Sequence, residues 1–291
     1  APIYRGEGSP LGAPLPPAPW EPIHEPSARP PALRTKMIHD RPAHAYYYVS
    51  PSTDPYYNIA LEDYLYRQLR PLDTIYMLWV NRPSVFMGRY QCAEAELDMA
   101  YLEKRQIALL RRSSGGGTVY HDLGNLNFSV ISNDHTGRGF DLKAFPEPVQ
   151  AALATLGVEV VRSPRGDLRL DGLKVGGAAE ATSRSRMLYH ICLLFDTDLD
   201  ELERILTVPE TEARSRVASV RSVVTNLRPH LPAGFTIEDF KASILSELER
   251  RHAGALYPLD FRPQVEDYIR EQRETHFEHP DWIHAPIGRA K

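Results

Sequence analysis

Residues 111–131 read RRSSGGGTVYHDLGNLNFSVI, in which three consecutive glycines lead into a segment where polar and apolar residues alternate. The alternation runs from residue 125 to residue 130. A period of two places successive side chains on opposite faces of a β-strand. The sequence therefore predicts a strand with one apolar face for a core and one polar face that can line a site beside the glycine loop.

The segments on either side of this strand predict a chain in which strands dominate the middle and helices punctuate it. Helical spacing of apolar residues, capping residues and β-rich runs mark the elements. We expect helices over residues 58–69, 94–105, 148–156, 199–206 and from Thr236, whose cap pairs it with Asp239, and strands over 74–80, 107–112, 158–163 and 187–195. This order favours an α+β fold class over regularly alternating βα units.

Composition excludes several classes of function. The chain has 291 residues, of which 34 are Lys or Arg and 38 are Asp or Glu, so its formal net charge is −4 and no basic field draws it to nucleic acid. We expect no membrane span, because no run of eighteen apolar residues occurs. The two cysteines, Cys92 and Cys192, are too few for a disulfide framework and indicate a reducing compartment, although a single bridge stays open.

Residues 1–45 are rich in proline and show no apolar period. Such a segment cannot offset the entropy of ordering, so we expect a flexible N-terminal extension. It resembles the remains of an organelle-targeting sequence, although Glu7, Glu21 and Glu25 are unusual for an intact, acid-poor transit peptide. A disordered extension without a function is the alternative.

The glycine loop has the residue types of an anion site. Glycines at 115–117 can reach positive φ, hold no side chain against a ligand and can form a nest of N–H groups. A strand follows them, so the loop matches neither of the glycine-rich phosphate loops that open a helix. A tight turn without a ligand is the alternative for the glycines alone.

Charged neighbours strengthen the interpretation of the loop as a site. Arg111 and Arg112 alternate on a strand, so one of them should face the site and supply a planar donor that is always charged. His121 and Asp122 follow the loop, either as site members or as satisfied polar residues at a strand end.

A second cluster of charge lies on a predicted hairpin. Asp171 and Gly172 between alternating residues indicate a two-residue turn, which places Arg169 opposite Lys174. Like charges directly opposed are destabilising, so we expect an anion to neutralise them. Asp167 and a bound phosphate are the candidates, and the alternative is that both cations splay into water.

Three segments resemble one protein family, namely 111–131 with its glycine loop and HDLGN, DGLKVGGAAE at 171–180 and SVRSVVTNL at 219–227. Together with WVNRPSVFMGRYQ at 79–91, they resemble lipoate–protein ligase A and the mitochondrial lipoyltransferases, in consistent order. The resemblance implies a catalytic domain of the lipoate/biotin ligase type over residues 46–285, with a mixed β-sheet and surrounding helices. It also implies a short tail over 286–291, without the accessory C-terminal domain of the full bacterial ligases.

The resemblance implies two chemical steps. Lipoate and ATP, with Mg²⁺, give lipoyl-AMP and pyrophosphate, and the acyl group then passes to a lysine. The implied acceptors are lipoyl domains of the E2 subunits of 2-oxoacid dehydrogenases and the glycine-cleavage H protein. Some relatives start from ready-made lipoyl-AMP, depend on a separate activating subunit, or take an octanoyl or lipoyl group from an acylated protein. The motif TVYHDLGN and the leader favour a mitochondrial location, with the cytoplasm as the alternative.

The resemblance also implies a role for each matching residue. Lys174 matches the central lysine, which contacts the acyl carbonyl and the α-phosphate without being acylated. Arg112 matches an arginine on the nucleotide phosphates or the acyl carboxylate. The implied nucleotide side also includes Gly117, Thr118, Val119, Tyr120 and Asp167, the last also a possible Mg²⁺ contact, and the implied acyl side includes Ser114, Gly115, Gly116, His121 and Asn125. Residues 219–227 match a segment that closes over the adenylate and limits its hydrolysis.

Departures from the family pattern keep two other readings open. Gly176 replaces a usual serine after the hairpin, and Gly166 replaces a usual asparagine before the acidic residue, which motivates a catalytically weak module that only binds lipoyl domains. A thioester on Cys192, two residues after His190 in the strand, is the second reading. Its apolar neighbours favour a buried strand cysteine instead. The loop pattern disfavours biotin ligation.

Overall fold

The computed structural model describes residues 44–70, 73–135, 137–207, 215–261 and 264–285, which belong to one compact unit. The expected extension over residues 1–45 lies outside these ranges except for its last two residues, and the expected tail over 286–291 lies outside them entirely. Across the described ranges, no helix is long and apolar enough to cross a membrane.

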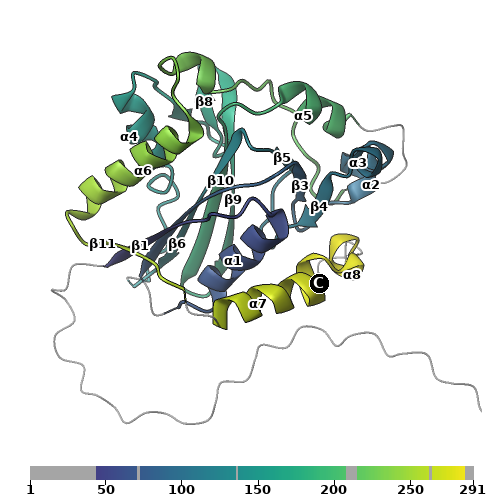
Figure 1. Cartoon of the computed structure of the whole chain (residues 1–291), viewed down its shortest axis with the longest axis horizontal. Helices are drawn as coiled ribbons and strands as arrows, with labels where there is room; N and C mark the ends of the chain where they lie inside the picture. Colours follow the sequence, from purple (N-terminus) through teal and green to yellow (C-terminus); the bar gives the residue numbers. More distant parts are fainter. Residues whose placement is uncertain (1–43, 71–72, 136, 208–214, 262–263, 286–291) are drawn as a thin grey trace, which may run out of the picture. The chain divides into compact units, whose positions relative to one another are not determined.

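Two β-sheets organise this unit (Figure 1). The large sheet has the strand order β11-β1-β2-β6-β10-β9-β8-β7, and the small sheet has the order β4-β3-β5. The strands are β1 (Ala45–Val49), β2 (Thr74–Val80), β3 (Ser84–Met87), β4 (Ala108–Arg111), β5 (Val119–His121), β6 (Asn125–Asn133), β7 (Val161–Arg162), β8 (Leu168–Leu170), β9 (Leu173–Ser183), β10 (Arg186–Leu194) and β11 (Leu256–Pro258). Strand β1 is parallel to β2 and β11, whereas β6 is antiparallel to both of its neighbours, which confirms the mixed sheet of an α+β fold.

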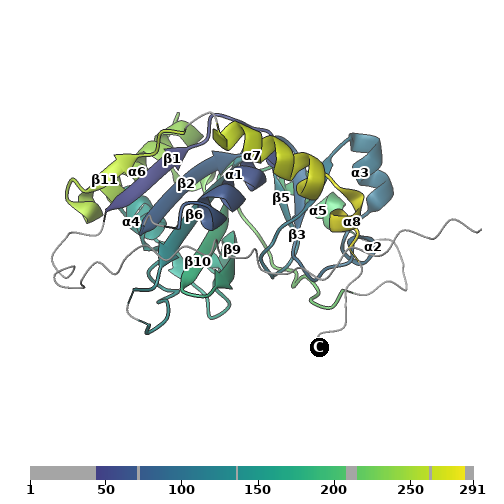
Figure 2. The same cartoon turned by 90° about the horizontal axis from the view of Figure 1, so that it is seen from below.

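Helices cover both faces of the large sheet (Figures 1 and 2). The helices are α1 (Pro55–Arg67), α2 (Ala93–Glu96), α3 (Met99–Arg105), α4 (Glu147–Thr155), α5 (Leu199–Leu206), α6 (Ile237–His252), α7 (Gln264–Gln272) and α8 (Pro280–Ile283), with a π-helical turn at Arg273–Phe277. Helices α4 and α6 pack on the apolar face of β6, which presents Leu126, Phe128 and Val130. Helices α1 and α7 pack together on the other side.

The alternation of β6 therefore separates core from site, as predicted. Its polar face points toward α1 and the small sheet, where Ser129 Oγ donates to Glu62 Oε1 of α1 at 2.5 Å. Helix α6 forms where the sequence predicts it, because Thr236 and Asp239 make a reciprocal capping box. Its stripe of Phe240, Ile244 and Leu248 lies in the core with α4.

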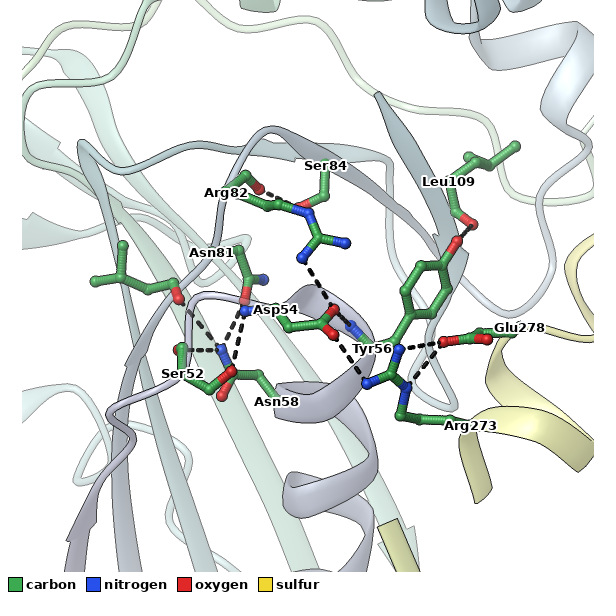
Figure 3. A network of polar contacts seen from close by, with 11 residues as sticks. Ser52, Asp54, Tyr56, Asn58, Asn81, Arg82, Ser84, Leu109, Arg273 and Glu278 are labelled. Carbon is green, nitrogen blue, oxygen red and sulfur yellow. Dashed lines mark hydrogen bonds and ion pairs between the residues drawn. The ribbon is translucent and has the colours of Figure 1, made fainter. Parts of the chain in front are cut away.

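A polar network fixes the start of α1 and joins it to the π-helical turn near the C-terminal end of the described chain (Figure 3). Asp54 caps α1 by accepting from the Tyr56 N–H, and it also pairs with Arg273 at 2.9 Å. Asn58 Nδ2 donates to the carbonyls of Ser52 and Val80 and to Asn81 Oδ1 at 2.9 Å. These bonds join α1 to the loop after β2, which is the loop that leads into the small sheet.

Two expected elements and one expected connection differ from those observed. The helix expected over 94–105 is two helices, α2 and α3, because Asp98 caps a new helix by accepting from the Tyr101 N–H at 3.0 Å. The strand expected over 158–163 shortens to β7. The glycine loop does not lead directly into β6: β5 comes first and pairs with β3 in the small sheet.

The predicted hairpin is present between β8 and β9. Asp171 and Gly172 have φ of 48° and 84°, as in a type I′ turn, and Arg169 faces Lys174 across the strands. The hairpin thus sets the register of β9 and the position of Lys174.

Gly172→Ala should lower the free energy of unfolding by about 1–2 kcal/mol, because a Cβ is strained in left-handed backbone. An added Cβ would meet nothing within 4 Å, so the cost is conformational. Denaturant unfolding measures it, with Gly115→Ala as the matched control, since Gly115 has open space and no positive φ. Equal stability of the two variants would contradict the assignment of the turn.

Candidate active site

A cavity of about 270 Å³ lies where the polar face of the large sheet meets the glycine loop. It is lined by residues of β2, β6, β9 and β10, by the glycine loop, and by residues 217–220 and 222. Its charged lining residues are Glu62, Arg112, Arg165, Asp167 and Lys174, with His121 and His190. The cavity combines cations with aromatic walls, as expected for an anionic ligand that carries an apolar chain.

Arg112 shapes the glycine loop. Its guanidinium donates to Ser114 Oγ and to the carbonyls of Phe86, Gly115 and Gly117, at distances of 2.6 to 3.0 Å. The side chain is 6% exposed, and burial lowers the pKa of Arg112 to about 10, so it stays charged at neutral pH. The expectation that one of the two neighbouring arginines faces the site is confirmed for Arg112.

Arg111 points away from the cavity and has a structural role. It donates to the carbonyls of Trp282 and Ile283 at the end of α8, and to those of Gly88, Arg89 and Gln91. A cation at the C-terminal end of a helix is favourable, because the carbonyls there carry partial negative charge. Arg111 therefore ties the C-terminal helix to the loop that follows β3.

Gly88 packs against the glycine loop, a contact that sequence reasoning missed. A Cβ at this position would lie 2.1 Å from the Gly116 carbonyl oxygen and 3.3 Å from an Arg112 nitrogen. Only a glycine lets the two loops approach this closely. Gly116 itself has φ of 87°, which also favours glycine. Gly88 lies in the GRYQ part of the resembling segment, but its sequence neighbours give no sign of a partner that is 28 positions further along the chain.

Lys174 lies at one end of the cavity with its charge paired. Its Nζ is 2.9 Å from Asp167 Oδ1, and Asp167 Oδ2 is 3.6 Å from Arg169. The predicted opposition of two cations is thus relieved by Asp167. The Nζ lies over Gly177, since a Cβ at Gly177 would be 3.0 Å from it.

Residues 217–227 form a segment that bonds to the backbone of Lys174, and residues 217–220 and 222 of it line the cavity. The Lys174 N–H donates to the Val223 carbonyl and the Thr225 N–H donates to the Lys174 carbonyl, both at 3.0 Å. Ser219 Oγ accepts from the Thr118 N–H and from Gln91 Nε2, again at 3.0 Å. The segment thereby connects the central lysine to the glycine loop.

A buried chain of polar groups crosses beneath the loop. Glu62 contacts His190 Nδ1 at 3.1 Å, and His190 Nε2 is 2.8 Å from Ser114 Oγ. A Ser–His–Glu order is that of a hydrolase triad, but Ser114 is 1% exposed and its Oγ accepts from Arg112. Its geometry serves to fix the loop. Glu62 was missed, and His190 was considered only as a neighbour of Cys192, because their sequence contexts are an ordinary helix and strand.

Residues 54–249 match the model of the lipoyl protein ligase A/B catalytic domain. The chain belongs to this family. Among its relatives, the lipoate-protein ligase LplJ of Bacillus subtilis is 38% identical over 196 residues, and lipoate–protein ligase 1 of Staphylococcus aureus is 36% identical over 197 residues. Each match covers 67% of this chain but only 59% and 60% of the relatives, so the chain spans about 60% of their length.

Solved structures of lipoate–protein ligases have the same fold. One of lipoate-protein ligase A bound with ATP has a TM-score of 0.65 at 26% identity, and covers 84% of this chain and 98% of that one. A bipartite lipoate protein ligase from Thermoplasma acidophilum, described with its E2 lipoyl domain, has a TM-score of 0.69 at 26% identity, and covers 86% of this chain and 98% of that one.

Most residues that the family resemblance implies line one cavity. These are Arg112, Gly116, Gly117, Thr118, Val119, His121, Asp167 and Lys174. Ser114, Gly115 and Asn125 lie behind the lining, where Ser114 and Gly115 bond Arg112 and Asn125 bonds Asn127. The Tyr120 side chain is on the opposite face of β5, in the cluster with Val85 and Met87. Any contact that Tyr120 makes with a ligand in this cavity must therefore come from its backbone.

The lining of the cavity also contains one of the two cysteines. Cys192 is a buried strand residue, as expected, with Sγ 3.4 Å from the Gly177 carbonyl oxygen. Cys92 lies outside the lining and donates to Glu94 at 3.0 Å. Burial and the Glu94 carboxylate raise the pKa of Cys92, which keeps its thiol protonated and argues against a thioester there.

Gly88→Ala should lower kcat/KM of lipoyl transfer, the reaction of the family's ligases, by about 100-fold, because a displacement of the loop near 1 Å costs this much. Steady-state kinetics measures the effect. Gly254→Ala is the control: it strains a positive-φ glycine after α6 and should lower stability without changing kcat/KM. An unchanged kcat/KM for Gly88→Ala would show that the contact with Gly116 is not needed.

Proposed function

We propose that the protein attaches lipoyl groups to lysines of lipoyl domains through a lipoyl adenylate. The observation that carries this proposal is the placement of Lys174, paired with Asp167, at one end of a cavity whose wall is the Arg112-bound glycine loop. The named relatives are lipoate–protein ligases, and one solved relative is described with bound ATP.

In the first proposed step, a lipoate carboxylate oxygen attacks the α-phosphorus of ATP and pyrophosphate leaves. Negative charge develops on the phosphoryl oxygens, and the Lys174 ammonium and the Arg112 guanidinium are two of the cations that line the cavity. Fixed cations in a desolvated site stabilise such charge more than water does. Asp167 Oδ1 lies 2.9 Å from the Lys174 Nζ and so fixes the position of the ammonium before the phosphate arrives.

In the second proposed step, the acceptor lysine attacks the acyl carbonyl, AMP leaves and the attacking amine loses a proton. Lys174 Nζ then stabilises the carbonyl oxygen as it becomes an oxyanion. The segment over residues 217–222, held by Ser219, covers the adenylate and excludes water, which would otherwise hydrolyse it.

Mg²⁺ enters this proposal with ATP. Among the described residues, no group of three His, Cys, Asp or Glu side chains could hold a metal ion. Asp167 is the carboxylate beside Lys174, and it is engaged by two cations. A Mg²⁺ ion would therefore rely on phosphate oxygens and water for most of its ligands, as is usual for this ion.

The acceptors in this proposal are E2 lipoyl domains and the glycine-cleavage H protein, and the T. acidophilum relative is described with an E2 lipoyl domain. That relative is bipartite, which favours testing whether this chain needs a separate activating subunit. A mitochondrial location, which the leader and the motif TVYHDLGN favour, stays a prediction.

Transfer from an acylated protein is the alternative catalytic function, and a module that only binds lipoyl domains is the non-catalytic one. The intact Lys174–Asp167 pair and the Arg112-bound loop favour catalysis, because a binding module has no need of either. Gly176 is accommodated closely, since a Cβ there would lie 3.0 Å from the Cys192 carbonyl oxygen. The usual serine would crowd β10 in this chain.

A purified lipoyl domain should gain the mass of one lipoyl group when incubated with the full chain, lipoate and ATP-Mg²⁺, and also with synthetic lipoyl-AMP. Intact mass spectrometry measures the gain. Gain with lipoyl-AMP alone would make the chain a transferase that needs a partner for activation. If neither donor works and an acylated protein donor also fails, catalysis is excluded.

Lys174→Met should lower both half-reactions by about 100-fold or more, because one electrostatic donor at a developing oxyanion contributes this much. Pyrophosphate release measures activation, and the mass shift with lipoyl-AMP measures transfer. Lys143→Met, which changes an exposed lysine, is the matched control and should leave both rates unchanged. A variant at Lys174 with normal rates would remove this residue from the mechanism.

A further inference from the structure

Four residues form a row across the large sheet on its cavity side. Trp79 of β2 is paired with Asn127 of β6, Asn127 with Cys192 of β10, and Cys192 with Gly177 of β9. All four line the cavity. Neighbouring strands lie about 4.8 Å apart, so Asn127 is two strand spacings from Gly177, the residue under the Lys174 ammonium. The row therefore leads from the reacting end of the cavity to an end walled by Trp79.

Asn127 brings a hydrogen-bond donor to the Trp79 half of the cavity. Its Oδ1 accepts from Asn125 Nδ2 at 3.1 Å. Its Nδ2 has no hydrogen-bond partner among the described residues, although the side chain is only 2% exposed. Buried N–H groups are almost always paired in native proteins, so an unpaired one beside a cavity indicates a group that a ligand completes.

His121 brings a second donor, and its tautomer follows from its neighbours. Asn58 Nδ2 donates to two backbone carbonyls and to Asn81 Oδ1, which fixes the Asn81 amide (Figure 3). Asn81 Nδ2 must then donate to His121 Nδ1, at 3.1 Å. Burial lowers the pKa of His121 to about 3, so the ring is neutral and carries its one proton on Nε2.

The Nε2–H of His121 is also unpaired among the described residues, and the side chain is 3% exposed. The ring stacks on Phe86 with 4.5 Å between centroids and meets Trp79 edge-on at 5.9 Å. Both unpaired donors thus belong to the aromatic end of the cavity, remote from Lys174. A carboxylate or acyl carbonyl at Lys174 does not account for them.

We propose that Asn127 and His121 determine specificity, by selecting acyl chains that carry weak hydrogen-bond acceptors at the end remote from the carboxylate. This inference rests on the proposed function. The dithiolane sulfurs of a lipoyl group are such acceptors, whereas an unsubstituted octanoyl chain has none. Sulfur is a weak acceptor and also packs favourably against aromatic rings, here Trp79 and Phe86. A site with buried donors disfavours an analogue that leaves them unpaired.

Isothermal titration calorimetry on the full chain tests the inference with three ligands: lipoate, octanoate and 5-cyclopentylpentanoate, in which two methylenes replace the sulfurs of lipoate. The unsubstituted protein should bind lipoate about threefold to tenfold more tightly than the carbocycle, the range that one net hydrogen bond provides. Because the cyclopentane is the more apolar ring, burial alone predicts the opposite order. This comparison needs no variant and does not depend on the folding of one.

Asn127→Leu is a change of similar volume. It should bring the ratio of the affinity for lipoate to the affinity for 5-cyclopentylpentanoate toward one, and octanoate should bind more tightly than it does to the unsubstituted protein. Cys192→Ala is the matched control from the same row and should keep the ratio, whatever it does to the absolute affinities. Equal affinities of the unsubstituted protein for lipoate and the carbocycle would overturn the selection and leave the proposed function standing. If none of the three acids binds, and lipoyl transfer also fails, the proposed function falls and the inference falls with it.

Discussion

The arrangement of the site depends on one buried cation. Arg112 is nearly inaccessible to solvent, and removal of a guanidinium from water is costly unless its N–H groups are bonded. The glycine loop supplies two of its four acceptors, Ser114 supplies one, and β3 supplies the fourth. The loop can turn these carbonyls inward only where glycine permits the backbone and where Gly88 leaves room. The burial of Arg112 therefore requires glycines in the loop, because only they let the loop carbonyls accept from the guanidinium.

That constraint extends through the sheet. Ser114 connects Arg112 to His190 of β10, and His190 connects to Glu62 of α1. These contacts fix the position of the loop relative to a strand and a helix that lie in the core. Glu62 in turn accepts from Ser129, which accepts from the Trp79 indole at 2.9 Å. Because each group in this chain has a partner, the position of the loop is coupled to the wall that holds the far end of the cavity.

The features that could be predicted from the sequence are those that depend on residues close together along the chain. Alternation over β6, the Asp171–Gly172 turn and the capping box of Thr236 each need only a few consecutive residues, and each is present. The family motifs located Lys174 and most of the cavity lining. What the sequence could not provide are contacts between residues far apart along the chain. The approach of Gly88 to Gly116 depends on how the small sheet pairs. The break between α2 and α3 lies at Asp98, whose N–H donates to the Ile205 carbonyl and whose carboxylate pairs with Arg204 of α5.

The two ends of the cavity separate two kinds of recognition. At one end, Asp167 pairs with Lys174 at 2.9 Å and lies 3.6 Å from Arg169, so the groups there carry full charges. At the other end the histidine ring is neutral, and the unpaired groups are N–H dipoles among aromatic side chains. In the proposed function, the carboxylate is therefore left to Lys174, and the chain end is recognised by shape and by weak hydrogen bonds from neutral donors.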